Sequence, residues 1–183
     1  MSNNWYELGP FTVFDVETTG MSPSRNCMVE IAAARIEIDG HITRWESLIN
    51  PGCQIPYAAT RVHHITDEMV ADAPSFSDVG FEFMDLARDS TLVAHNARFD
   101  LGFLQESLSR HGIELWRGKT MDTIRLMKQA YAGLPSYSLQ NLRQAFQLDD
   151  YEGQEAHRAA ADVEWTIQIL KISLTALIKT CRS

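Results

Sequence analysis

Three short motifs, FDVETTG, HNARFD and HRAAAD, spread four carboxylates and one histidine over almost the whole chain. They contain Asp15 and Glu17, then Asp100, and finally His157 and Asp162. Side chains of these types bind metal ions and carry protons when they lie together. A fold that uses them in one site must therefore bring the beginning, the middle and the end of the chain to one point.

Asp15 and Glu17 end an apolar run, PFTVFDVE, which is typical of a β-strand. Side chains two residues apart in a strand leave the same face, so both carboxylates are predicted to point into one cleft. Like charges held this close repel each other and push one group toward protonation, unless a cation lies between them. The pair therefore predicts a divalent metal ion.

Strands are predicted in the first third of the chain at residues 10–17, 28–38 and 41–49. The turn dipeptide Asp39-Gly40 joins the second and third of them, so we expect a meander of three antiparallel strands. The following stretch, residues 50–66, is polar and contains two prolines and a glycine. We expect it to form a long loop.

Strands and helices alternate in the rest of the chain. The patterns predict a helix after Pro74, a strand at 91–95, a helix at 98–111 ended by Gly112, a strand near 116–121, helices near 122–131 and 138–146, the latter capped by Ser138, and a last helix over 159–180. A meander followed by such alternation predicts an α/β fold with a mixed sheet and helices on both faces. We expect one domain over residues 1–183.

Composition excludes several classes of protein. The chain has 45% hydrophobic residues and no apolar run near the roughly 20 residues of a bilayer span, so no membrane role is expected. The N-terminus does not resemble a signal peptide, and Cys27, Cys53 and Cys181 suggest free thiols, so we expect a cytoplasmic protein. The net charge of −8 argues against a non-specific nucleic-acid coat but not against an enzyme.

The remaining motif residues are expected close to the Asp15–Glu17 pair. Asp100 is expected in the first turn of the helix after the strand TLVAH, near the carboxyl end of that strand, where open α/β sheets place their ligands. His157 and Asp162 would point about 140° apart on one helix. We therefore expect His157 on the loop before the last helix and Asp162 in the first turn of that helix. Such an oxygen-rich site suits Mg²⁺ or Mn²⁺ better than zinc.

In this order and at these separations, DVETTG, HNARFD and HRAAAD resemble the three exonuclease motifs of the DEDD superfamily, in its DEDDh branch. More closely, the chain resembles the exonuclease domain of the bacterial DNA polymerase III epsilon (proofreading) subunit, over roughly residues 10–175. The resemblance implies a ribonuclease H-like fold, which agrees with the predicted order of elements. It also implies a 3′-to-5′ exonuclease that releases nucleoside 5′-monophosphates by a two-metal mechanism.

The resemblance assigns a role to each motif residue. Asp15 would bridge both ions, Glu17 and Asp162 would complete the site that carries the attacking water, and Asp100 would serve the second ion. His157 would be the general base, because an unperturbed histidine pKa of about 6.5 lies close to the operating pH. Two ions can stabilise both the attacking and the leaving oxygen of a phosphoryl displacement.

The resemblance also implies a pocket for the last nucleotide of the substrate. The backbone of Thr18 and Thr19 would meet the 3′-hydroxyl, and the pocket for the last base would be lined by Met21, Val62, His63 and Phe99. Gly20, in the same turn, would also belong to the substrate-binding residues. The sequence departs from the family pattern at one position, because the usual V-H-G-I is Val62-His63-His64-Ile65 here. His64 would stack on a base, contact phosphate or face solvent.

Each motif residue taken alone also has an ordinary structural explanation, such as a solvated strand end or a helix-start acid, and only their joint occurrence favours catalysis. His95 and Asn96 are expected to hold a strand-to-helix turn by hydrogen bonds. Three hypotheses of function remain: an exonuclease acting on single-stranded or frayed DNA 3′ ends in proofreading or repair, an exoribonuclease that trims RNA, and a non-catalytic module bound to a replicative or repair polymerase. The DNA exonuclease is the preferred hypothesis of the three.

Overall fold

The computed structural model describes residues 4–149 and 158–180 of the chain. Five strands form one sheet in the order β3-β2-β1-β4-β5. The strands are β1 (Phe11–Thr18), β2 (Met28–Ile36), β3 (Ile42–Leu48), β4 (Thr91–Ala94) and β5 (Thr120–Asp122). The first three pair antiparallel, whereas β4 and β5 run parallel to β1. The predicted meander and mixed sheet are therefore confirmed.

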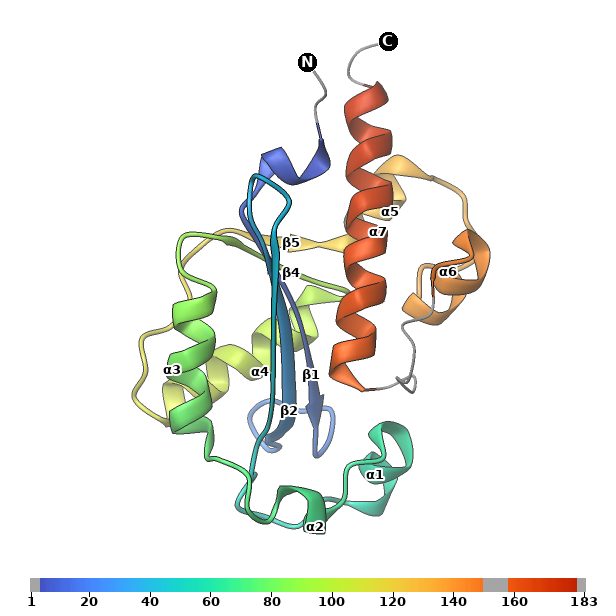
Figure 1. Ribbon diagram of the computed structural model, residues 1–183. Coiled ribbons are helices and arrows are strands. Elements are labelled where there is room, and N and C mark those ends of the chain that lie inside the picture. Colours follow the sequence, from blue (N-terminus) through green and yellow to red (C-terminus); the bar gives the residue numbers. More distant parts are fainter. Residues whose placement is uncertain (1–3, 150–157, 181–183) are drawn as a thin grey trace.

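Helices cover both faces of the sheet, as predicted. They are η1 (Trp5–Leu8), α1 (Tyr57–His63), α2 (Asp67–Val70), α3 (Phe76–Leu86), α4 (Ala97–Arg110), α5 (Thr123–Ala130), α6 (Leu139–Phe146) and α7 (Ala159–Thr180). Figure 1 shows α3 and α4 on one side of the sheet and α7, with α5 and α6 beyond it, on the other. No helix among the described residues combines the length and apolar composition that a bilayer span requires.

The two faces of β1 point into two different hydrophobic clusters. Phe14 and Val16 pack with α3 and α4. Phe11 and Val13, which alternate with them, pack with the apolar side of α7. Because side chains alternate along a strand, the residues that continue the second series, Asp15 and Glu17, also face α7. The packing of the strand thus decides which helix meets the acidic pair.

Two helix ends have the capping residues that the sequence predicted. Ser138 accepts a hydrogen bond from the amide of Asn141 at the start of α6, at 3.4 Å. Gly112 follows α4 with a φ of +66°, and the amide of Ile113 reaches back to the carbonyl of Leu108 at 3.0 Å. This arrangement is a Schellman motif, in which glycine avoids the steric cost of a left-handed conformation.

The prediction of a long loop over residues 50–66 was wrong, because α1 lies within it. This helix has only seven residues and no apolar stripe that a periodicity search would detect. A small cluster of Val29, Ile55, Ile65 and Val70 forms beneath α1 and α2. Tertiary contacts therefore stabilise the helix, which is too short to be stable on local propensity alone.

Candidate metal centre and active site

The structure brings together three of the predicted ligands. Asp15 and Glu17 extend from the end of β1, and Asp162 extends from the first turn of α7. Each of the three side chains has a carboxylate oxygen within 4.8 Å of one from each of the others. Residues separated by most of the chain thus converge as the motifs predicted. A single divalent cation can be bound by oxygens at such separations.

Asp100 approaches the same strand from the opposite direction. It lies in the first turn of α4 with only 3% of its surface exposed. Its Oδ1 accepts a hydrogen bond from the amide of Val16 at 3.3 Å, midway between Asp15 and Glu17 in sequence. Asp100 lies outside the close trio of ligands but near enough to act electrostatically on both Asp15 and Asp162.

Burial and mutual repulsion raise the pKa values of these carboxyl groups. Burial raises the pKa of Glu17 to about 9, with further contributions from Asp162, Glu30 and Asp100. Burial likewise raises the pKa of Asp100 to about 7. The pKa of Asp15 is raised well above its usual value by burial and by the neighbouring carboxylates, Asp100 foremost. The protein alone thus holds protons at neutral pH where a divalent cation would replace them.

The donor set indicates the kind of ion that fits. The converging groups are carboxylates, and no cysteine or histidine among the described residues joins the trio. Carboxylate oxygens are ligands that hard divalent cations prefer, whereas zinc sites usually use nitrogen or sulfur. The site is therefore chemically suited to hard divalent metal ions. His157, the predicted general base, lies outside the described residues, one position before Arg158.

The end of β1 and the turn after it contain four of the predicted substrate-pocket residues. Thr18 donates its hydroxyl hydrogen to the carbonyl of Gly20 at 2.8 Å. The Thr19 amide donates to the carbonyl of Cys27 at 2.9 Å, so this N–H already has a partner within the protein. Met21 projects from the turn with 80% of its surface exposed, which leaves its side chain open to a substrate.

The other predicted pocket residues lie on α1 and α4. Val62 is exposed, whereas His63 is buried and accepts a hydrogen bond on Nδ1 from the Ile65 amide at 3.1 Å. Burial lowers the pKa of His63, and the Thr18 backbone and Glu30 partly offset this effect. Its Nε2 has no hydrogen-bond partner among the described residues. Phe99 is half-buried and packs on Phe103, with ring centroids 5.0 Å apart.

His95 and Asn96 play structural roles, although not through the turn bonds that we expected. The His95 ring bonds the Thr123 hydroxyl through Nδ1 at 2.8 Å and the Tyr137 carbonyl through Nε2 at 2.9 Å. It therefore connects the end of β4 to α5 and to the segment before α6. Asn96 adopts a left-handed backbone conformation with φ of +70° and makes no side-chain cap. Asparagine tolerates this conformation better than most residues.

Sequence reasoning missed two residues beside the acidic cluster, Glu30 and Arg158. Glu30 lies opposite Glu17 in the β1–β2 register and is 3% exposed. It pairs with Arg158, which immediately precedes α7. The available signal was a single charged residue within the apolar run MVEIAAA, because a buried carboxylate requires a partner.

Comparisons with known proteins agree with this geometry. The chain is 35% identical over 166 residues to the DNA polymerase III subunit epsilon of Treponema pallidum, covering 90% of this chain and 76% of that protein. It is 33% identical over 169 residues to the PolC-type DNA polymerase III of Bacillus cereus, covering 92% of this chain and 12% of that protein. The chain thus spans only about a tenth of the PolC-type relatives.

Solved structures show the same architecture. Exonuclease X in complex with 5′ overhanging duplex DNA superposes with a TM-score of 0.71 at 28% identity, covering 93% of each chain. E. coli Exonuclease I in complex with a dT13 oligonucleotide superposes with a TM-score of 0.82 at 21% identity, covering 94% of this chain and 42% of that one. The family model described as Exonuclease (RNase_T) matches residues 12–170. The chain therefore belongs to the Exonuclease family, and its sheet and helices have the architecture of these solved exonucleases.

Proposed function

We propose that the chain is a 3′-to-5′ exonuclease that hydrolyses phosphodiester bonds at DNA 3′ ends and releases nucleoside 5′-monophosphates. The observation that carries the proposal is the convergence of Asp15, Glu17 and Asp162 within 4.8 Å, with Asp100 beside them. Four carboxylates in one partly buried site destabilise the protein unless protons or metal cations neutralise them. Mg²⁺ or Mn²⁺ matches the all-oxygen donor set.

Each acidic residue has a distinct place in the proposed site. Asp15, Glu17 and Asp162 would hold one ion, and Asp15 and Asp100 would hold a second. When bound, two ions would stabilise the attacking and leaving oxygens of the displacement. His157 accepts the proton of the attacking water. The closeness of Asp15, Glu17 and Asp162 supports the first set of ligands, and the separate approach of Asp100 supports the second.

The relatives favour DNA as the substrate. The Treponema relative is an epsilon subunit of DNA polymerase III, and Exonuclease X was solved with duplex DNA. We propose that the chain acts on single-stranded or frayed DNA 3′ ends in the cytoplasm, in association with a replicative or repair polymerase. We also propose that residues 1–183 form one exonuclease domain, which the single five-stranded sheet supports.

The proposed substrate pocket lies on the surface around the acidic cluster. Thr18, Thr19, Gly20 and Met21 would contact the 3′-terminal nucleotide from the end of β1 and the turn after it. Val62, His63 and Phe99 would contact it from α1 and α4. The exposed side chains of Met21 and Val62 support this assignment, because packing a base against them would remove apolar surface from water.

A product ladder tests the proposed function. Matched DNA and RNA oligonucleotides carrying a 5′ label are incubated with the protein in Mg²⁺, in Mn²⁺ or in chelator. We expect stepwise shortening of DNA from the 3′ end, faster than of RNA, and none with chelator. Faster RNA shortening would favour the trimming exoribonuclease, and the absence of metal-dependent cleavage would favour the non-catalytic module.

Two charge-matched variants sharpen this test. Asp15→Asn removes the shared ligand with little change of shape. We expect the cleavage rate to fall by roughly 10³-fold, as it does when a group that stabilises the transition state is removed. Glu46→Gln removes an exposed carboxylate one strand beyond β2 and is expected to retain activity within about twofold. Near-normal cleavage by Asp15→Asn would refute the bridging role.

A further inference from the structure

A partly buried ion pair, between a buried Glu30 and a half-buried Arg158, lies between the acidic cluster and the start of α7. The Arg158 Nη2 donates to Glu30 Oε1 at 2.6 Å, and its Nε lies 3.2 Å from both carboxylate oxygens. The amide of Ala159, the first residue of α7, donates to Glu30 Oε2 at 3.0 Å. The Glu30 side chain on β2 therefore binds both the Arg158 side chain and the first backbone amide of α7. Glu30 and Arg158 are 128 residues apart in the sequence.

The first turn of α7 connects this pair to a metal ligand. The carbonyl of Arg158 accepts hydrogen bonds from the amides of Ala161 at 2.9 Å and Asp162 at 3.2 Å. Residues four apart in an α-helix lie one turn, about 5.4 Å, from each other. A displacement of Arg158 is thus transmitted through one turn of backbone to the Asp162 carboxylate.

Stability alone gives little reason for a carboxylate at position 30. Glu30 lies opposite Glu17 and adds negative charge that raises the pKa values of Glu17 and Asp15. Replacing a buried ion pair with apolar side chains is often neutral or stabilising. A pair that adds a fifth carboxylate to a repulsive cluster is better explained by the geometry that it imposes.

We propose that Glu30 and Arg158 are positioning residues that hold the first turn of α7, and with it the Asp162 carboxylate, at ligand distance from Asp15 and Glu17. This role rests on the proposed function, because it concerns the same metal site. Outer partners that orient metal ligands typically change metal affinity or activity by about 10- to 100-fold when they are removed.

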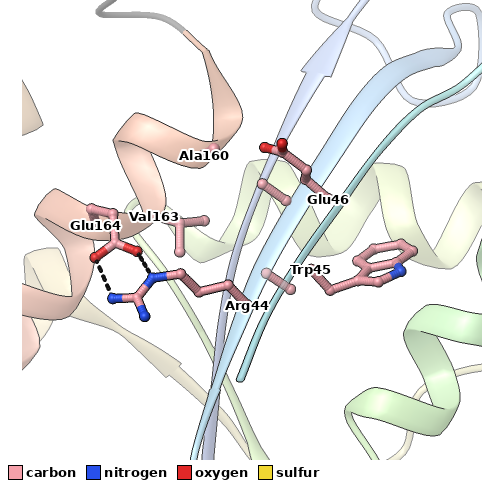
Figure 2. A pocket seen from close by; sticks show the side chains of 8 residues that line it. Arg44, Trp45, Glu46, Ala160, Val163 and Glu164 are labelled. Atoms are coloured by element: carbon pink, nitrogen blue, oxygen red, sulfur yellow. Dashed lines mark hydrogen bonds and ion pairs between the residues drawn. The ribbon is translucent and has the colours of Figure 1, made fainter. Parts of the chain in front are cut away.

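The same helix provides a matched control. Arg44 on β3 forms a second arginine–carboxylate pair with Glu164, with Nη2 and Oε2 3.1 Å apart. This pair lines a cavity of about 260 Å³ between the sheet and α7. Figure 2 shows the pair together with Glu46, Ala160 and Val163, which also line the cavity. Both pairs join the sheet to α7, but the two Arg44–Glu164 hydrogen bonds involve neither Glu30 nor a member of the close trio of carboxylates.

The test compares Arg158→Met, the double variant Glu30→Gln/Arg158→Met and Arg44→Met with the wild type. Mn²⁺ affinity is measured by calorimetry, kcat and KM on a DNA oligonucleotide, and stability by urea unfolding. Loss of the Arg158 charge by itself would favour cation binding through simple electrostatics. Positioning predicts the opposite sign, a Kd for Mn²⁺ about 10- to 100-fold weaker with a lower kcat and an unchanged KM.

The double variant separates positioning from stability. It has the same net charge as the wild type and leaves no unpaired buried charge, so it is expected to regain stability lost in Arg158→Met. Its Mn²⁺ affinity and kcat are expected to remain low, whereas Arg44→Met retains both. Tighter Mn²⁺ binding by Arg158→Met, or recovery of kcat in the double variant, overturns the positioning role. A wild type that neither binds Mn²⁺ nor cleaves DNA overturns the proposed function and this inference together.

Discussion

At the residue scale, His64 occupies a backbone conformation that usually belongs to glycine. It ends α1 with φ of +62°, and its amide donates to the carbonyl of Thr60 at 2.7 Å. A side chain in the left-handed region costs about 1–2 kcal/mol because Cβ crowds the following carbonyl. The family pattern V-H-G-I has glycine at this position, and the structure supplies the physical reason.

We expect His64→Gly to increase the free energy of unfolding by about 1 kcal/mol, since glycine removes the steric cost but gains entropy when unfolded. The reciprocal change, Gly112→Ala, is expected to lower it by a similar amount. Gly112, like His64, has a positive φ, of +66°, and a Cβ there would meet no atom within 4 Å. Urea unfolding measures both changes. A destabilised His64→Gly variant would mean that the imidazole makes a contact worth more than the strain.

At the element scale, the segment that carries α1 and α2 has its own small core. Ile65 is fully buried in it, and the Thr60 hydroxyl donates to the Ile65 carbonyl at 3.0 Å. The cluster holds Val29 from β2, whereas Ile55, Ile65 and Val70 come from the segment itself. With so few buried contacts to the sheet, this segment is expected to open at a lower free energy than the rest.

Ile65→Ala is expected to remove about 2–5 kcal/mol of packing energy from that segment. Hydrogen exchange should show loss of protection confined to residues 55–70. KM for DNA should rise more than kcat falls, because Val62 and His63 belong to the proposed pocket and not to the metal site. Ile169→Ala serves as the control, because Ile169 lies on α7 in a separate cluster with residues of α5 and α6. This variant is expected to lower global stability with KM unchanged. Uniform loss of protection in Ile65→Ala would show that the segment does not open independently.

At the scale of the whole molecule, the acidic cluster links stability to pH and to metal ions. Glu17 has a pKa of about 9 in the folded protein and an ordinary value of 4.5. Between these values the folded state holds a proton that the unfolded state has released. Stability is therefore lost as pH rises through this window, and one pKa unit corresponds to about 1.4 kcal/mol.

Urea unfolding in chelator, between pH 5.5 and pH 9, tests this linkage. We expect the wild type to lose stability relative to Glu17→Gln as pH rises. Both proteins contain His63 and His95, whose pKa values are lowered by burial. These histidines affect the pH dependence of stability with the opposite sign, and the comparison with Glu17→Gln separates their effect from that of Glu17. Mn²⁺ should stabilise the wild type increasingly with pH, because the ion competes with protons for the same oxygens. Parallel pH profiles of the two proteins in chelator would contradict the raised pKa.

The local pattern of residues was sufficient to predict most of the sheet and the placement of Asp15, Glu17 and Asp162 on their elements. Alternation along β1 predicts that Asp15 and Glu17 share a face, because the strand period is two. Apolar spacing predicts α7 with Asp162 in its first turn, because the helix period is 3.6. Motif order then predicts that these residues meet, and the structure brings their oxygens together. The role of His157 as general base stays a prediction.

Other features depend on partners that no local pattern specifies. Helix α1 forms because Ile65 is buried against residues from other elements, and Asp100 meets the Val16 amide across 84 residues. Glu30 is a single charge in an apolar run until Arg158, from the far end of the chain, packs against it. The sequence by itself determined the periodicities, hence the elements and the face of each ligand. Only the tertiary structure decided which buried charges pair, because the free energy of a buried charge depends on neighbours distant in sequence.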